Sequence, residues 1–129
     1  MEIKLKQSGY SKYFNVLKIL SKLTDPQIKP FCNLRNRELE LFAILLYLYN
    51  EKYSMIPEPQ RSQVLFSYDT KAEICQLLGD VSFDVIYNLS LQLRKWGLIS
   101  KKEIDKKYLL PNFNEFKISF YEEEKRNTD

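Results

Sequence analysis

The sequence predicts a single domain that is mainly α-helical with a few short strands (α+β). Over several stretches, apolar residues recur at spacings of three and four, which is the period of a helix with one buried face. The chain has 129 residues, enough for one core but too few for two comfortable ones. Apolar and polar residues alternate at 2–6 and 116–120, so short strands are expected near both ends.

Two helices are expected in the first half of the chain. The first begins near Ser11 and has apolar residues on one face and lysines on the other, the apolar ones being Tyr13, Phe14, Leu17 and Leu20. Pro26 and Pro30 disfavour helix in the residues before them, so residues 24–30 are expected to form a loop. Residues 37–52 are apolar on nearly every side, which is typical of a central helix packed all round.

Residues 53–67 contain two prolines and no regular period, and they are expected to form a long loop. Such loops are often functional or face a partner. The alternative is a surface excursion whose apolar run, Val64, Leu65 and Phe66, packs back onto the core. Cys32 and Cys75 are both expected to be core residues, because free cysteine is usually buried.

Two short helices at 68–78 and 83–96 are joined by only four residues. Ser67, or a capping box from Thr70 to Glu73, begins the first helix, and Ser82 caps the second. A glycine follows the end of each helix, at positions 79 and 97. Two short helices, a tight turn and a second helix with one polar face are the requirements of a helix-turn-helix.

The motifs of this region resemble the winged-helix families. Residues 70–79 resemble their x-x-x-E-I-x-x-x-L-G helix, residues 80–82 the turn, and residues 85–99 the recognition helix that ends in L-x-x-x-G-L-I. Further motifs, L-R-x-R-E-L-E at 34–40, L-F-S at 65–67 and L-L-P at 109–111, are similar to those of small phage-encoded winged-helix proteins.

The resemblance implies a winged helix-turn-helix. Residues 1–129 would form one domain with its core at about 34–110, an N-terminal helix and short terminal β-strands. The helix at 83–96 would lie in the major groove of double-stranded DNA, and the hairpin after it would contact the flanking backbone.

The outward face of the 83–96 helix is only partly suited to DNA. Asn88 can make paired hydrogen bonds to adenine, and the other candidate DNA-binding residues are Ser82, Tyr87, Arg94 and Lys95. Asp84 on the same face repels phosphate, and Leu91 is more typical of a protein contact.

The densest cationic stretch follows this helix. Residues 98–100 and 108–110 are expected to pair as a β-wing across a segment that contains the remaining candidate DNA-binding residues, Lys101, Lys102, Lys106 and Lys107. These lysines are suited to contacting phosphates. The alternative is a solvated hairpin whose lysines only keep an exposed edge from pairing.

An enzyme is not expected. The sequence has no histidine, which excludes an ordinary catalytic triad and an imidazole base, and its three isolated glycines form no phosphate loop. The common zinc spacings are also absent, so no metal or other cofactor is expected. Four carboxylates are more simply caps and surface charges than an acid–base pair: Glu38, Glu40, Asp80 and Asp84.

The leading hypothesis is therefore a DNA-binding regulator of transcription, and the net charge of +3 permits such a partner. The rival is a structural or adaptor protein, such as a phage particle or assembly component. Leu91, the aromatic ends and the 53–67 loop favour that rival. A dimeric regulator is expected under the leading hypothesis and a larger assembly under the rival, so a homo-oligomer or member of a larger assembly is expected. The longest apolar run, residues 39–49, is too short to span a bilayer, so no membrane contact is expected. The expected location is cytoplasmic, in the host cytoplasm or in the virion if the protein is phage-encoded.

Overall fold

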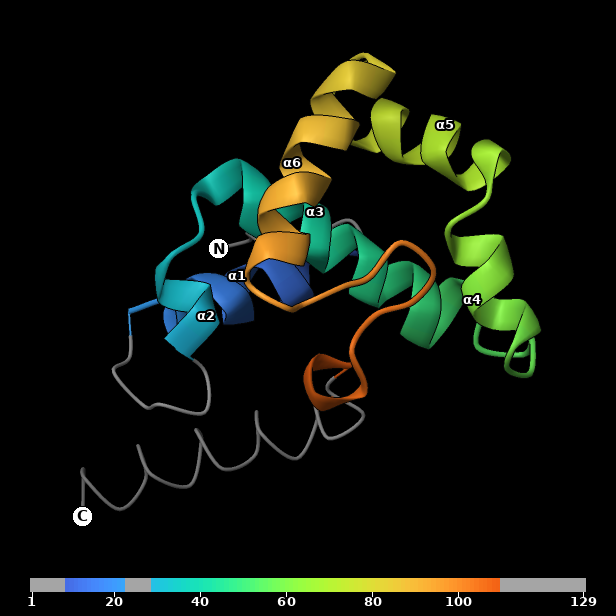
Figure 1. The fold of residues 1–129 in the computed structure, drawn as a ribbon, viewed down its shortest axis with the longest axis horizontal. Coiled ribbons are helices and arrows are strands. Elements are labelled where there is room, and N and C mark those ends of the chain that lie inside the picture. Colours follow the sequence, from blue (N-terminus) through green and yellow to red (C-terminus); the bar gives the residue numbers. More distant parts are fainter. Residues whose placement is uncertain (1–8, 23–28, 110–129) are drawn as a thin grey trace, which may run out of the picture.

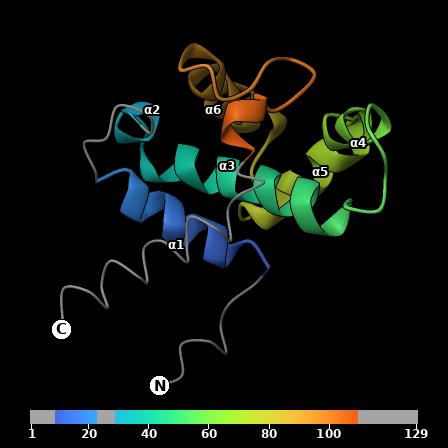
Figure 2. The same ribbon diagram turned by 90° about the horizontal axis from the view of Figure 1, so that it is seen from below.

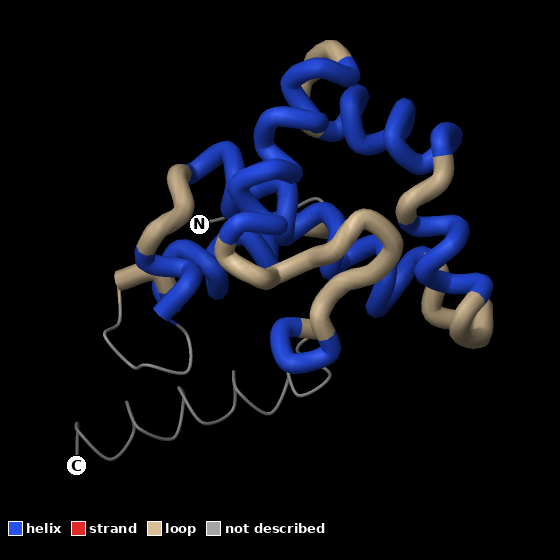
Figure 3. The backbone as a smooth tube through the Cα atoms, viewed as in Figure 1, coloured by secondary structure: helices blue, strands red, loops and turns tan. Residues whose placement is uncertain are grey.

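The computed structural model describes residues 9–22 and 29–109 of this protein, and most of them are helical (Figure 1). The elements are α1 Ser11–Leu20, α2 Lys29–Cys32, α3 Asn36–Tyr47, the π-helix η3 Leu48–Lys52, α4 Gln60–Leu65, α5 Tyr68–Leu77, α6 Phe83–Lys95 and the 3₁₀ helix η4 Lys106–Tyr108. Figure 3 shows only helices and loops over these residues.

Helix α3 is the centre of the domain, as its all-round apolar pattern predicts. Its residues from Glu38 to Leu46 are buried with the exception of Glu40. Figure 2 shows α1 along one side of α3, while α6 and the loop after it cover the opposite side. The buried Glu38 is satisfied locally, because its Oε1 accepts a hydrogen bond of 2.8 Å from the backbone N–H of Arg35.

Helix α3 continues into one π-helical turn. The backbone N–H of Tyr53 donates to the carbonyl of Leu48 at 2.7 Å, five residues back, so the backbone widens where α3 ends. The side chains that leave this turn reach two different helices. Glu51 binds Lys12 and Tyr13 of α1, and Lys52 pairs with Glu73 of α5.

The predicted winged-helix fold with a β-wing is wrong for the residues that the structure describes. They contain no strand, only one isolated antiparallel bridge between Ile99 and Ile104. Of the expected pairing of 98–100 with 108–110, no part forms in the described residues, which end at 109, because the chain already reverses between 100 and 103. Tyr108 instead packs edge-on against Phe31, with ring centroids 5.8 Å apart, and this contact draws the segment onto the core.

Of the other local predictions, some are wrong and some are confirmed. Residues 53–67 are not a loop throughout, since α4 occupies Gln60–Leu65. Residues 29 and 30 of the predicted loop at 24–30 belong to α2, and the rest of that loop lies outside the described residues. Leu65 is buried and its two neighbours are half-buried, so the expected packing of this run is confirmed. Cys75 is buried as predicted, but Cys32 is exposed. The predicted strands at 2–6 and 116–120 lie outside the described residues.

Candidate functional site

Helices α5 and α6 meet through a tight turn at residues 78–82 (Figure 1). Both predicted caps are present: the Ser67 hydroxyl accepts from the Thr70 N–H at 3.3 Å, and the Ser82 hydroxyl accepts from the Val85 N–H at 3.4 Å. Gly79 has a φ of 99° and the next residue, Asp80, a φ of 60°. Two consecutive left-handed residues reverse the chain and set α6 against α5.

Helix α6 is amphipathic. Ile86 and Leu93 are buried against the core, whereas most of the predicted outward residues are exposed, namely Asp84, Tyr87, Asn88, Leu91 and Lys95. Arg94 differs from that prediction because it is half-buried, and the Cζ atom of its guanidinium lies 5.9 Å from the centroid of the Tyr87 ring. Its side chain therefore runs back along α6 towards Tyr87, seven residues earlier. A loop follows α6 in the chain.

This loop, residues 98–104, is held in a defined turn. The Ser100 N–H donates to the carbonyl of Glu103 at 2.8 Å, and the Asp105 N–H donates to the carbonyl of Leu98 at 2.9 Å. The Ser100 hydroxyl accepts from the backbone N–H groups of Lys102 and Glu103, each at 3.2 Å. These bonds give the exposed lysines of the loop a fixed backbone to project from.

A hollow of about 300 Å³ lies between α5, α6 and this loop. We call it the basic hollow, and its lining residues are Phe66, Lys71, Ile86, Tyr87, Ser90, Arg94, Ile99, Ser100 and Lys101. The buried Ile86 and Ile99 form its apolar base, and no acidic residue is among those that line it. Three cations from three separate segments therefore surround one site.

Two further hollows continue from the basic hollow along α4 and the loop. The second, of about 300 Å³, shares Phe66 and Lys101 with it and adds Lys102. The third, of about 550 Å³, shares Lys102 with the second and adds Lys106. Glu58 and Glu103 also line this third hollow, so its charge is mixed and it is less suited to a polyanion.

The structure brings only some of the predicted DNA-binding residues together. Tyr87, Arg94 and Lys101 line the basic hollow, and Lys102 and Lys106 line its continuation. The others lie apart from these hollows: Ser82 caps the far end of α6, Asn88 is exposed outside them, and Lys95 lies over the Trp96 ring, 5.5 Å from its centroid. For Lys107, the structure describes only the backbone, within η4.

Six of the nine residues that line the basic hollow are not among the predicted DNA-binding residues: Phe66, Lys71, Ile86, Ser90, Ile99 and Ser100. Lys71 lies in the motif at 70–73, which predicts the start of a helix, and helical periodicity does not show which neighbour an exposed residue of α5 faces. Phe66 belongs to an apolar run that was expected to pack, and it is half-buried. The signal that could have found Lys71 is its position three residues before Ile74, whose burial fixes the inner side of α5.

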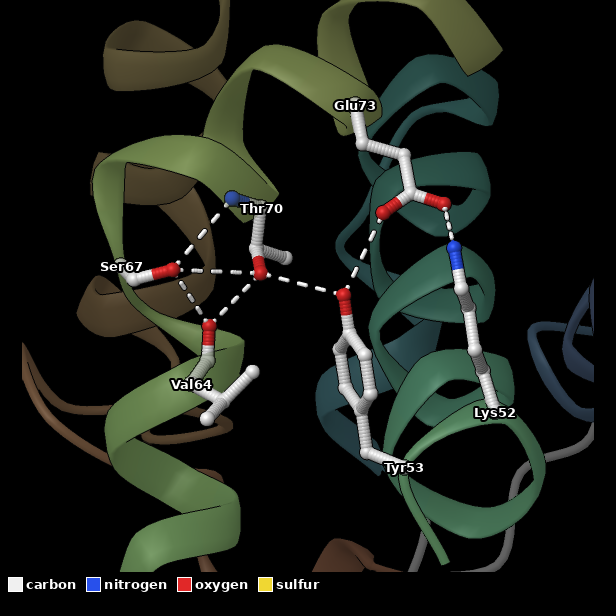
Figure 4. A network of polar contacts seen from close by, with 6 residues as sticks. All are labelled: Lys52, Tyr53, Val64, Ser67, Thr70 and Glu73. Carbon is white, nitrogen blue, oxygen red and sulfur yellow. Dashed lines mark hydrogen bonds and ion pairs between the residues drawn. The ribbon is translucent and has the colours of Figure 1, made fainter.

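A network of polar side chains holds α5 against the end of α3 (Figure 4). The buried Thr70 donates from its hydroxyl to the Val64 carbonyl at 2.7 Å. The Tyr53 hydroxyl lies 3.2 Å from the Thr70 hydroxyl and donates to Glu73 at 3.3 Å. Glu73 also pairs with Lys52, and this hydrogen bond raises the pKa of the Lys52 ammonium. The network fixes the helix that carries Lys71.

Two kinds of feature are absent from residues 9–22 and 29–109. None of their helices has the length and apolarity that crossing a membrane requires. Likewise, no three histidine, cysteine, aspartate or glutamate side chains in these ranges come together as a metal-binding group.

Comparison of this chain with protein-family models, with curated proteins and with solved structures found no match. The resemblance to winged-helix families accordingly rests on the sequence motifs alone, at 34–40, 65–67, 70–99 and 109–111.

Proposed function

We propose that this protein binds double-stranded DNA through the basic hollow and the exposed face of α6, as a regulator of transcription would. One observation carries the proposal: Lys71, Arg94 and Lys101 come from α5, α6 and the following loop, yet they line the same hollow without an acid among them. Such a group of cations neutralises phosphates and releases their counterions.

Helix α6 supplies the groups that would contact bases. Asn88 is exposed one residue after Tyr87, and its amide can bond an adenine edge in the major groove. Asp84 occupies the first turn, where it favours the helix dipole but repels phosphate. The middle of α6, rather than its N-terminus, is therefore the segment proposed to face the bases. Ser82 is assigned to capping instead of DNA contact.

The experiment is a fluorescence-anisotropy titration of a labelled random duplex at about 50 and 200 mM salt. Binding through several phosphate contacts weakens steeply between these concentrations. The supporting result is measurable binding at the lower salt that is lost or strongly reduced at the higher salt. Absence of binding at the lower salt would refute the proposal.

Matched variants locate the surface. Lys71→Gln and Lys101→Gln each remove one charge from the basic hollow and are expected to weaken binding to every duplex sequence. Lys22→Gln is the control, because Lys22 is an exposed lysine two residues after α1, and this helix lies on the opposite side of α3 from α6 (Figure 2). Equal losses in all three variants would indicate dependence on net charge alone.

A structural or adaptor role is the second candidate, favoured by exposed apolar side chains. Leu91 on α6 is 39% exposed and Tyr68 on α5 is 72% exposed, and such side chains suit a protein partner. Analytical sedimentation tests whether the partner is a second copy. A mass that rises with concentration, and that Leu91→Ser returns to the monomer value, would favour this candidate.

A further inference from the structure

We infer that the basic hollow accepts an unpaired nucleotide of the bound DNA, with its base against Tyr87 and Phe66 and its phosphate between the cations. This inference rests on the proposed DNA binding and goes further, because it states that a nucleotide leaves the base stack at this site. It follows from the kinds of side chain that share the hollow.

The lining combines three chemistries that a nucleotide requires. Phe66, Ile86 and Ile99 supply an apolar base, and the Tyr87 ring adds an aromatic wall that is 58% exposed. All four nucleobases can stack on such rings, so this contact depends little on the DNA sequence. Lys71, Arg94 and Lys101 supply positive charge for the phosphate.

The Arg94 side chain joins the aromatic and the cationic parts. Its guanidinium lies over the Tyr87 ring, 5.9 Å from the centroid, so charge and ring form one wall. The hydroxyls of Ser90 and Ser100 also line the hollow and can bond a base edge or a sugar. A duplex backbone alone would use the cations and leave the apolar base unfilled.

The shape of the site also favours an unpaired nucleotide. The hollow of about 300 Å³ is lined by residues of α5, α6 and the turn at 98–104, and Tyr87 from the exposed face of α6 is one of them. A base inside a duplex presents only its edges to a protein. Only a nucleotide that has left the stack can place its face against Tyr87.

The test compares three duplexes of equal length, whose two ends are closed by linkers that contain no nucleotide. One is fully paired, one has a single bulged thymidine, and one has a bulged abasic residue that keeps the phosphate and lacks the base. We expect the thymidine bulge to bind at least about fivefold more tightly than both other duplexes. Equal affinity for the thymidine and abasic bulges would overturn the inference while leaving the duplex proposal intact. Absence of binding to all three duplexes would overturn both.

Tyr87→Leu tests the assigned ring, and its exposure makes the substitution compatible with folding. It is expected to reduce the ratio of affinities for the thymidine-bulged and fully paired duplexes to about one. The control is Tyr68→Leu, which removes an exposed tyrosine ring from α5 outside the lining of the hollow and should keep the wild-type ratio. A ratio that survives Tyr87→Leu would contradict the assignment of Tyr87.

Discussion

The guanidinium of Arg94 lies over the ring of Tyr87, 5.9 Å from Cζ to the ring centroid, across two turns of α6. This contact places a half-buried cation where α5, α6 and the loop at 98–104 meet. Arginine differs from lysine here, because only its planar group can stack on an aromatic ring. The pair therefore links the electrostatic and the stacking parts of the proposed site.

Substitutions of Arg94 should separate these two parts. Arg94→Gln removes the charge and should reduce the slope of log K against log salt by about one for duplex DNA. Arg94→Lys keeps the charge, so the slope should stay as in the wild type while the affinity falls with the lost stacking. Anisotropy titrations over four salt concentrations measure both quantities. An unchanged slope in Arg94→Gln would remove this residue from the phosphate-binding set.

The cap at Ser82 should affect stability and leave DNA affinity unchanged. Its hydroxyl accepts from the Val85 N–H at 3.4 Å, so Ser82→Ala should lower the free energy of unfolding by about 1 kcal/mol. Ser82→Asn should retain most of it, because asparagine also caps helices. Urea unfolding followed by circular dichroism gives the stabilities. A large loss of DNA affinity in well-folded Ser82→Asn would return this residue to the DNA contacts.

A side chain on Gly9 should force the Tyr47 ring to move. A Cβ atom on Gly9 would lie 2.2 Å from Cε1 of the Tyr47 ring, which is far inside contact distance. Gly9→Ala should therefore lower the free energy of unfolding by about 1–3 kcal/mol. In the Tyr47→Leu background the same substitution should cost clearly less. Additive losses in this double-mutant cycle would show that the two residues do not meet.

Because of the hydrogen bond from Tyr49 to Glu58, the free energy of unfolding should fall at both ends of the pH range. The Tyr49 hydroxyl donates to Oε2 of Glu58 at 2.5 Å. This bond, with those from Ser62, lowers the pKa of the Glu58 carboxyl. Burial, together with the nearby carboxylate, raises the pKa of Tyr49 to about 12.

The two pKa shifts predict losses of stability at opposite ends of the pH range. Because the folded state lowers the pKa of Glu58, its contribution is present above the ordinary carboxyl pKa of 4.5 and is lost as the pH falls through the folded-state value. Because the folded state raises the pKa of Tyr49, its contribution is complete below pH 10 and is lost as the pH rises through about 12.

Tyr49→Phe should make the stability depend less on pH than in the wild type, at both the acidic and the alkaline end of the range. Urea midpoints measured from pH 3 to pH 12 provide the comparison, and Tyr68→Phe is the control because its hydroxyl belongs to an exposed tyrosine. Curves for Tyr49→Phe that run parallel to the wild type at both ends would show that the bond has no such role.

Local signals in the sequence predicted the elements around the site well. Ser67 and Ser82 cap their helices as expected, and Gly79 and Gly97 adopt positive φ values of 99° and 78° where the helices end. These features depend on a few neighbouring residues, and the sequence shows them directly. The all-round apolar pattern of α3 likewise indicated a central helix, and it is buried on nearly every side.

The wrong predictions concern contacts between distant segments. The β-wing was expected from apolar residues at 98–100 and 108–110, but Tyr108 packs against Phe31, and no local pattern shows that partner. Helix α4 was missed because it has only six residues and follows two prolines. The basic hollow could not be predicted from local patterns, because it forms only where Lys71 shares a lining with Arg94 and Lys101. That arrangement depends on how α5 packs against α6.

The most direct test of the central claim is to map the DNA contacts by NMR. Amide chemical shifts of the labelled protein are followed during titration with a short random duplex at low salt. We predict that the largest changes gather at Lys71, Tyr87, Arg94 and Lys101, in three segments that meet only in the folded structure. Residues of α1, on the opposite side of α3, should change little. Changes centred on α1, or no changes at all, would contradict the claim that the basic hollow binds DNA.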